Sequence, residues 1–176
     1  MKTNVALIGF MGSGKTAVGR ALAKKLNRKF VELDLLIEQK AEKSIPEIFQ
    51  QDGEIAFREL EIEATKEIAR EKYLVIACGG GIVLNKINID RLKAESVIVY
   101  LTASPRVILK RVSGEAGQRP LLEVDNPTLT IRELLRFRKP FYERAADIRI
   151  DTTKLDIDSV VDQIINRLKE DESFNF

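Results

Sequence analysis

The stretch GFMGSGKT, residues 9–16, decides the fold because it satisfies the pattern G-x-x-x-x-G-K-[ST] at every position. It follows a short apolar run, Asn4 to Ile8, and opens an amphipathic segment from Thr16 to Leu26. Glycines let the backbone of such a turn wrap a phosphate group with its N–H groups, and the N-terminus of the following helix adds partial positive charge. The alternative is a glycine-rich turn that matches by chance, which this strand–loop–helix context makes rare. The stretch therefore predicts a nucleotide-binding site.

The residues of this loop have expected roles toward the nucleotide. Lys15 is placed to reach the β- and γ-phosphates, and the hydroxyl of Thr16 can ligate Mg²⁺. The residues that we expect to contact the nucleotide here are Gly12, Ser13, Gly14, Lys15, Thr16 and Ala17. GTPases and motor proteins share such a loop, so the loop alone does not specify the reaction.

Short apolar runs alternate with longer amphipathic segments along the chain, which is typical of a parallel sheet covered by helices in an α/β fold. The expected strands are Asn4–Ile8, Phe30–Leu33, Leu74–Cys78, Val97–Leu101 and Ile148–Ile150. Their hydrophobicity is continuous rather than alternating, as in strands buried on both faces. Capping patterns that indicate helix starts lie at Ser44–Glu47, Ser104–Pro105 and Thr130–Glu133.

The composition is that of one soluble domain spanning residues 1–176. Lys and Arg total 29 against 27 Asp and Glu, so the net charge of +2 gives no reason to expect nucleic acid or an anionic membrane as a partner. The chain has no histidine, so any general base must be a carboxylate. Its single cysteine, Cys78, excludes an intrachain disulfide. We find no transmembrane or signal-peptide pattern, which predicts a cytoplasmic location, and nothing demands more than a monomer.

The regular pattern breaks between Val112 and Thr130, where glycines and prolines punctuate the sequence. Such a long irregular segment inside a compact domain is usually functional. We therefore expect a lid at roughly residues 113–128.

Further motifs narrow the class. They are Glu32-Leu33-Asp34, Phe57-Arg58, Gly79-Gly80-Gly81, RPLL at residues 119–122 and RKPFY at residues 138–142. In this order and spacing the chain closely resembles the shikimate kinases along nearly its whole length. The resemblance implies a three-layer fold like that of the nucleoside monophosphate kinases. In that fold a five-stranded parallel sheet is flanked by helices, with a lid and a substrate-binding region at roughly residues 34–62.

The resemblance also implies a reaction. ATP, with Mg²⁺, would phosphorylate the 3-hydroxyl of shikimate to give shikimate 3-phosphate and ADP, a step of chorismate and aromatic amino-acid biosynthesis. One alternative is a kinase of the same fold with another acceptor, such as gluconate or a nucleoside monophosphate. The other is a nucleotide-dependent switch without turnover, although the sequence contains no N-K-x-D guanine motif.

Two residues are candidates for holding the acceptor. Asp34 ends an expected strand, where ligands of open α/β sheets bind. The resemblance makes Asp34 the ligand of the substrate hydroxyls and the proton acceptor, and the alternative is that it caps the following helix. Arg58 is implied to clamp the substrate carboxylate, and the alternative is a helix-surface pair with Glu54 or Glu61.

The remaining acceptor residues follow the same resemblance. Missing side chains at Gly79, Gly80 and Gly81 would let the backbone approach the substrate ring, and a tight strand-to-helix turn is the simpler explanation. The R-x-P-x-Y match selects Arg138 as a second carboxylate or hydroxyl ligand, with Arg136 as the fallback.

The metal and nucleotide sides carry further expectations. Glu32 matches a family position usually occupied by Asp that helps hold Mg²⁺, often through water, and the alternative is a solvated surface charge. Arg119 in the lid is implied to stabilise the transferring phosphoryl group, and the alternative is a flexible surface charge. Arg111 and Ile157 are implied to flank the adenine, although a cation at the end of a helix is favourable in any case.

Overall fold

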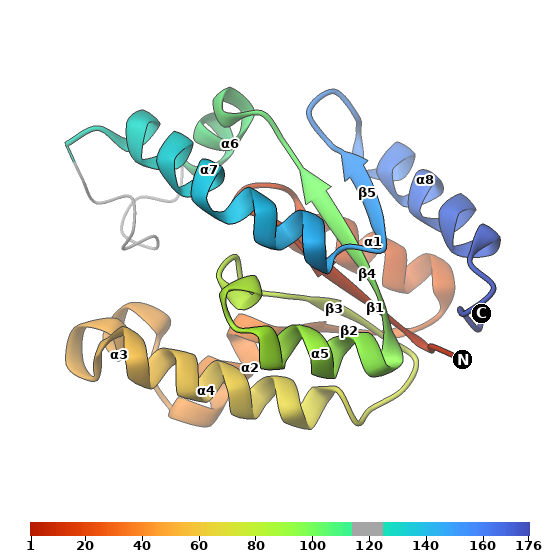
Figure 1. The fold of residues 1–176 in the computed structure, drawn as a ribbon, viewed down its shortest axis with the longest axis horizontal. Helices are drawn as coiled ribbons and strands as arrows, with labels where there is room; N and C mark the ends of the chain where they lie inside the picture. The colour runs from red at the N-terminus through yellow and green to blue at the C-terminus, as the bar shows by residue number, and fades with distance from the viewer. Residues whose placement is uncertain (114–124) are drawn as a thin grey trace.

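The computed structural model describes residues 1–113 and 125–176, which form a sheet with helices packed on both faces (Figure 1). The strands are β1 (Asn4–Ile8), β2 (Lys29–Glu32), β3 (Leu74–Ala77), β4 (Ser96–Thr102) and β5 (Ile148–Asp151). The helices are α1 (Lys15–Leu26), α2 (Leu33–Ala41), α3 (Ile45–Gln51), α4 (Gly53–Ile68), the 3₁₀ helix η1 (Ile82–Leu84), α5 (Lys86–Glu95), α6 (Pro105–Val112), α7 (Pro127–Ala145) and α8 (Ile157–Glu170).

The five strands are all parallel and lie in the order β2-β3-β1-β4-β5. Every residue of β1 is buried, because β1 is the central strand and both of its faces are covered. The continuous apolar runs in the sequence are the result of this two-sided burial. The predicted five-stranded parallel sheet is thus confirmed, with two corrections: Leu33 begins α2 rather than ending β2, and β3 ends at Ala77 rather than Cys78.

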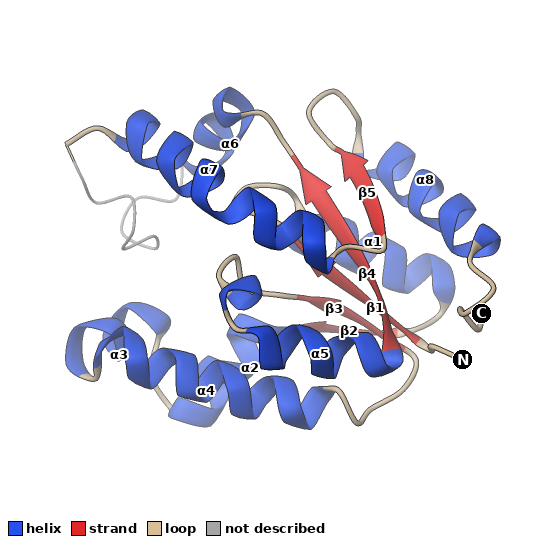
Figure 2. Cartoon of the chain, in the orientation of Figure 1, coloured by secondary structure: helices blue, strands red, loops and turns tan. Residues whose placement is uncertain are grey.

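Two apolar cores lie between the sheet and its two layers of helices. One face of the sheet packs against α2, α3, α4, α5 and α7, with Ile37, Ile48 and Leu92 in its core. The other face packs against α1 and α8, through Leu22, Ile164 and other fully or almost fully buried side chains. Figure 2 shows the resulting three layers, and the predicted three-layer architecture is confirmed.

A third, smaller core supports residues 9–16, which we call the phosphate loop. Phe10 and Met11 of this loop pack against Ile108 and Val112 of α6 and Ile131 of α7. The loop is therefore anchored to α6 and α7 by apolar contacts.

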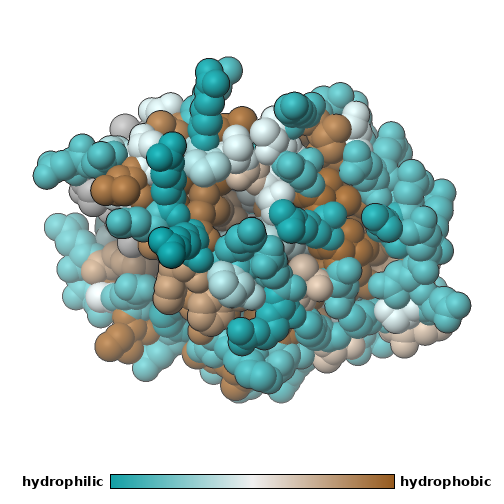
Figure 3. All heavy atoms as spheres, turned by 45° about the horizontal axis from the view of Figure 1, so that its top comes forward, coloured by the Kyte–Doolittle hydropathy of each residue, from teal (hydrophilic) through white to brown (hydrophobic). Residues whose placement is uncertain are grey.

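Hydrophilic side chains cover most of the face shown in Figure 3 and leave apolar areas between them. Among the helices of residues 1–113 and 125–176, none combines the length and the apolar character needed to cross a membrane.

The helix starts agree with the capping predictions at two of three places. Ser44 and Glu47 form a reciprocal capping box at α3, and the side chain of Ser104 accepts the backbone N–H of Val107 at α6. The prediction at Thr130 is wrong, because α7 begins earlier, with Asn126 as its N-cap and a proline following. That pair supplies a capping acceptor and a preset φ one turn upstream.

The predicted lid lies largely outside the described residues. Ser113 ends α6, and residues 127 and 128 already belong to the first turn of α7. Arg119 lies within residues 114–124 and is likewise outside the described part of the chain.

The capping box at α3 gives a testable expectation for stability. Ser44→Ala should lower the free energy of unfolding by about 1 kcal/mol, because the N–H of Glu47 loses its acceptor. Urea denaturation measures this change. Ser44→Asn, which can still accept this hydrogen bond, should recover most of the loss, and an equal loss in both variants would contradict the capping role.

Candidate active site

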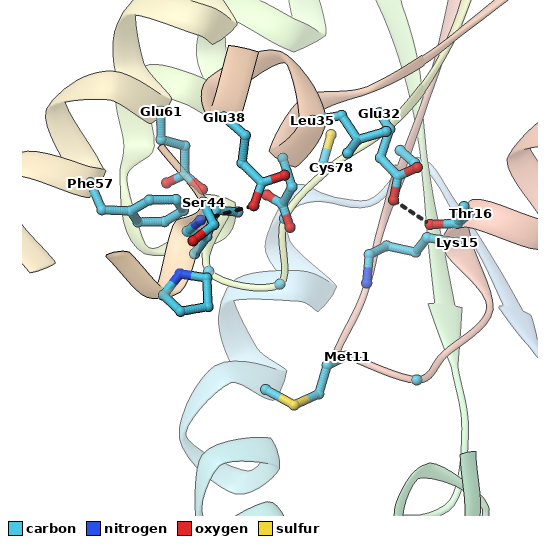
Figure 4. A pocket seen from close by; sticks show the side chains of 18 of the residues that line it. Met11, Lys15, Thr16, Glu32, Leu35, Glu38, Ser44, Phe57, Glu61 and Cys78 are labelled. Carbon is cyan, nitrogen blue, oxygen red and sulfur yellow. Dashed lines mark hydrogen bonds between the residues drawn. The ribbon is translucent and has the colours of Figure 1, made fainter. Parts of the chain in front are cut away.

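A cavity of about 730 Å³ lies where the phosphate loop faces the residues that follow β2 and β3 (Figure 4). It is lined by the phosphate loop, by parts of α2, α3 and α4, and by single residues of α6 and α7. The predicted site residues on its wall are Gly12, Gly14, Lys15, Thr16, Ala17, Glu32, Asp34, Arg58, Gly79, Gly80, Gly81, Arg111 and Arg138. The fold thus gathers residues far apart in the sequence into one space.

The phosphate loop has the conformation that its glycines predict. Gly12 and Gly14 have φ values of 72° and 97°, in the left-handed region that favours glycine. Gly14 is the N-cap of α1, so the first N–H groups of that helix border the loop. The ammonium of Lys15 donates to the carbonyls of Gly9 and Phe10, both at 2.9 Å. The loop thereby holds a cation beside the space that the nucleotide phosphates would fill. Of the predicted contacts in this loop, Ser13 is fully buried and does not line the cavity.

Thr16 and Glu32 form an oxygen pair next to the loop. The hydroxyl of Thr16 donates to Oε1 of Glu32 at 2.9 Å, drawn as a dashed line in Figure 4. Arg20 lies 3.5 Å from the other oxygen of Glu32. Hydroxyl and carboxylate oxygens suit Mg²⁺, which keeps several waters and phosphate oxygens as its other ligands. The hydroxyl of Thr16 and the carboxylate of Glu32 therefore fit a Mg²⁺ ion carried largely by the nucleotide.

Asp34 lies in the first turn of α2 rather than at the end of β2. The N-cap of that helix is Glu32, so the alternative that Asp34 caps the helix is wrong. A Cβ added to Gly79 would come within 2.8 Å of Oδ1 of Asp34. The carboxylate of Asp34 therefore lies against the glycine run, on the wall of the cavity.

Arg58 makes both of the contacts that the simpler interpretation predicted. Its guanidinium donates to Oε1 of Glu61 at 3.1 Å and to Oε1 of Glu54 at 3.2 Å. The same guanidinium lies so close to Gly81 that an added Cβ would be 2.5 Å from two of its nitrogens. The helix-surface pair and the position beside the glycine run thus exist together, and the acidic partners hold Arg58 there.

Glu61 is a site residue that sequence reasoning treated only as a possible partner of Arg58. It is 1% exposed, and it lines the cavity with Oε2 3.3 Å from the position of a Cβ on Gly79. Burial raises the pKa of the Glu61 carboxyl, and the neighbouring Arg58 only partly opposes this shift. The signal that could have found it is its spacing, three residues after Arg58 on one helix face.

Arg138, rather than Arg136, reaches the cavity. Arg138 is 5% exposed, with its guanidinium 5.7 Å from the ring centre of Phe10 and one nitrogen 3.6 Å from the position of a Cβ on Gly80. Arg136 is exposed and does not line the cavity. The geometry selects the arginine of the R-x-P-x-Y match.

The glycine run Gly79–Gly81 is thus the place where four ionisable side chains meet. Asp34 and Glu61 approach Gly79, Arg138 approaches Gly80 and Arg58 approaches Gly81, and a side chain at the first or third position would overlap Asp34 or Arg58. Cys78 precedes the run and is buried, which raises the pKa of its thiol to about 12. It behaves as a small buried apolar residue directly after β3.

The two residues expected near the adenine differ in their positions. Arg111 lines the cavity and donates to the carbonyls of Gly12, at 3.0 Å, and Thr152, at 3.2 Å. It therefore ties the phosphate loop to the segment after β5. Ile157 begins α8, is 45% exposed and is not part of the cavity wall.

The buried Glu61 makes stability depend on pH. Because its pKa is raised in the folded state above the ordinary value of 4.5, its ionisation costs stability as pH rises through the folded-state pKa. Glu61→Gln should therefore gain stability relative to the parent chain as pH rises above about 4.5, as followed by melting temperatures.

A matched control for this experiment is Glu63→Gln, on the same helix, whose side chain is 67% exposed. It removes the same charge without removing a buried carboxylate, so its difference from the parent should stay nearly constant with pH. If the parent chain instead becomes more stable relative to Glu61→Gln as pH rises, the ion pair with Arg58 outweighs burial, and the raised pKa assigned to Glu61 is wrong.

Comparisons with known proteins agree on one family. The shikimate kinase family model matches residues 11–169. Shikimate kinases from Thermodesulfovibrio yellowstonii and Caldanaerobacter subterraneus are 48% and 46% identical, and the alignments cover 92% of this chain and 92% and 94% of theirs. The solved shikimate kinase of Acinetobacter baumannii in complex with shikimate is 36% identical, with a TM-score of 0.93 over 98% of this chain and 96% of that one. The chain belongs to the shikimate kinase family.

Proposed function

We propose that Asp34, Arg58, Arg138 and the glycine run hold shikimate beside ATP bound at the phosphate loop. The chain is an ATP-dependent shikimate kinase, a transferase that uses Mg²⁺ and serves aromatic amino-acid biosynthesis. Its product is shikimate 3-phosphate, with ADP released. The observation that carries the residue assignment is the meeting of one carboxylate and two guanidinium groups on three glycines in the same cavity as the phosphate loop.

Arg58 and Arg138 bind the carboxylate of shikimate. A planar guanidinium can donate two parallel hydrogen bonds to a carboxylate, which fixes the orientation of the substrate as well as its charge. Both arginines lie against glycines, so their donors are brought to the backbone that faces the substrate ring. Neither glycine adds a side chain that would exclude the ring.

Asp34 accepts the proton of the reacting hydroxyl. The freed oxygen attacks the γ-phosphorus, the bond from that phosphorus to the bridging oxygen breaks, and ADP leaves with the electron pair. A carboxylate is the available base, because the chain contains no histidine. Lys15 neutralises charge on the β- and γ-phosphates, and most of the rate comes from positioning and electrostatics.

Thr16 and Glu32 would hold Mg²⁺, directly or through water. When bound, the ion neutralises charge that builds up on the β- and γ-phosphate oxygens. The hydrogen bond between Thr16 and Glu32 keeps these oxygens beside the loop. The protein therefore needs to supply only a small part of the metal's coordination.

Arg119 and the adenine ligands complete the proposal. Arg119 would stabilise the transferring phosphoryl group from a lid at roughly residues 113–128, where closure also excludes water as a competing acceptor. Arg111 and Ile157 would flank the adenine. The position of Arg111 on the cavity wall beside Gly12 supports its part.

The rest of the surface supports a cytoplasmic monomer that binds neither nucleic acid nor membrane. The net charge of +2 offers no strong field for a polyanion. Large exposed apolar side chains are scattered over different helices, for example Ile55 on α4, Ile87 on α5 and Phe137 on α7. Single residues of this kind do not form the contiguous apolar patch that a stable interface needs.

Steady-state kinetics on two variants would separate the proposed roles. Asp34→Asn should lower kcat by about 10²-fold or more with little change in the KM for ATP, because it removes the proton acceptor. Arg58→Ala should raise the KM for shikimate by about 10- to 100-fold, because it removes charged hydrogen bonds to the substrate.

Full turnover by Asp34→Asn would refute the base assignment. Arg132→Ala is a control for loss of an arginine, because Arg132 is exposed on α7 and does not line the cavity. If it raises the KM for shikimate as much as Arg58→Ala does, the effect is one of overall charge.

A further inference from the structure

Tyr142, the last residue of the R-x-P-x-Y match, has no role in the mechanism above, yet it contacts two parts of the substrate site. It is fully buried in α7, four residues after Arg138. Its hydroxyl donates to the carbonyl of Gly80 at 2.5 Å. The side chain of Arg138 lies close enough to the same hydroxyl to lower its pKa, and one of its nitrogens is 3.6 Å from the position of a Cβ on Gly80. The hydroxyl and the guanidinium therefore meet at the same glycine.

The surroundings of Tyr142 hold its ring in one orientation. The ring stacks on Tyr100 of β4, with centroids 4.9 Å apart and planes 20° apart. Burial raises the pKa of the Tyr142 hydroxyl well above its ordinary value of 10.0, so it keeps its proton under working conditions. It can then donate to Gly80 and accept from Arg138 at the same time.

We infer that Tyr142 is a positioning residue for shikimate: it sets the guanidinium of Arg138 and the carbonyl of Gly80 in the arrangement that receives the substrate carboxylate. The inference rests on the proposed role of Arg138. Phe10, beneath the guanidinium, packs against it and offers no oxygen to fix its rotation.

Arg138 needs a positioning residue because an arginine side chain has many rotamers and several donors. A guanidinium has five N–H donors in a rigid fork, and an acceptor that engages one of them orients the others. Without the hydroxyl, Arg138 can rotate and the carbonyl of Gly80 loses its donor. Binding of shikimate must then fix the rotamer of Arg138, which is already fixed in the parent chain, and this lowers the affinity.

Tyr142→Phe is the direct test, because it keeps the ring and its stacking and removes only the hydroxyl. The KM for shikimate should rise by about 10-fold, while the KM for ATP stays within about twofold of the parent value. A purely structural role would lower the melting temperature without separating the two substrates.

Tyr100→Phe is the matched control. It removes a hydroxyl from the other ring of the same stacked pair, and that hydroxyl is influenced electrostatically by Arg149 and Glu143 rather than by the substrate site. The KM for shikimate should not change in this variant. An equal rise in both variants would assign the effect to packing of the pair and overturn the inference.

A double-mutant cycle with Arg138→Ala separates the inference from the proposal beneath it. If Tyr142 acts through Arg138, adding Tyr142→Phe to Arg138→Ala should raise the KM for shikimate by less than twofold further. Fully additive effects would show that Tyr142 acts independently, and the inference would be wrong. If Arg138→Ala alone leaves shikimate binding intact, the proposed role of Arg138 fails instead.

Discussion

The absence of side chains at residues 79–81 is the constraint on which the substrate site depends. A Cβ on Gly81 would come within 2.5 Å of the guanidinium of Arg58, and one on Gly79 within 2.8 Å of the carboxylate of Asp34. Charged groups with flexible stems can approach a backbone this closely only where no side chain intervenes. The glycine run is thus a flat platform on which the carboxylate of Asp34 and the guanidinium groups of Arg58 and Arg138 come together.

The sheet topology explains why that platform faces the phosphate loop. β3 lies between β2 and β1, so the segments after β2, β3 and β1 leave neighbouring positions at the carboxyl edge of the sheet. Those segments carry Asp34, the glycine run and the phosphate loop respectively. Ligands of open parallel sheets bind at this edge for the same geometric reason. A nearly neutral chain can therefore bind two anions, because the cations that they need are gathered locally.

Much of this arrangement could be predicted from the sequence, for physical reasons that differ from part to part. The strands and the phosphate loop were predictable because two-sided burial and phosphate contact each impose a strong local pattern. Asp34 was expected at the end of a strand, but it lies in the first turn of α2. The edge strand β2 has only four residues and ends at Glu32, although the apolar residues continue beyond it. Helices after Asp34 and after the glycine run were expected without bounds, because charged residues in α2 and α5 interrupt the helical spacing of their apolar positions. Glu61 and Tyr142 each lie within about one helical turn of an expected site arginine, but their contacts with Gly79 and Gly80 join elements far apart in the sequence, which a local pattern does not reveal.

The central claim is that this cavity brings ATP and shikimate, and not another small acceptor, into reaction. The most direct measurement is the release of ADP from ATP and Mg²⁺ by the parent chain, with shikimate, gluconate or AMP as the acceptor in parallel. The account predicts release that depends on shikimate and is not matched by either of the other acceptors. If ADP were released with gluconate or AMP and not with shikimate, the assignment of nucleotide binding to the phosphate loop would still hold. That result would contradict the assignment of Asp34, Arg58 and Arg138 to a shikimate site.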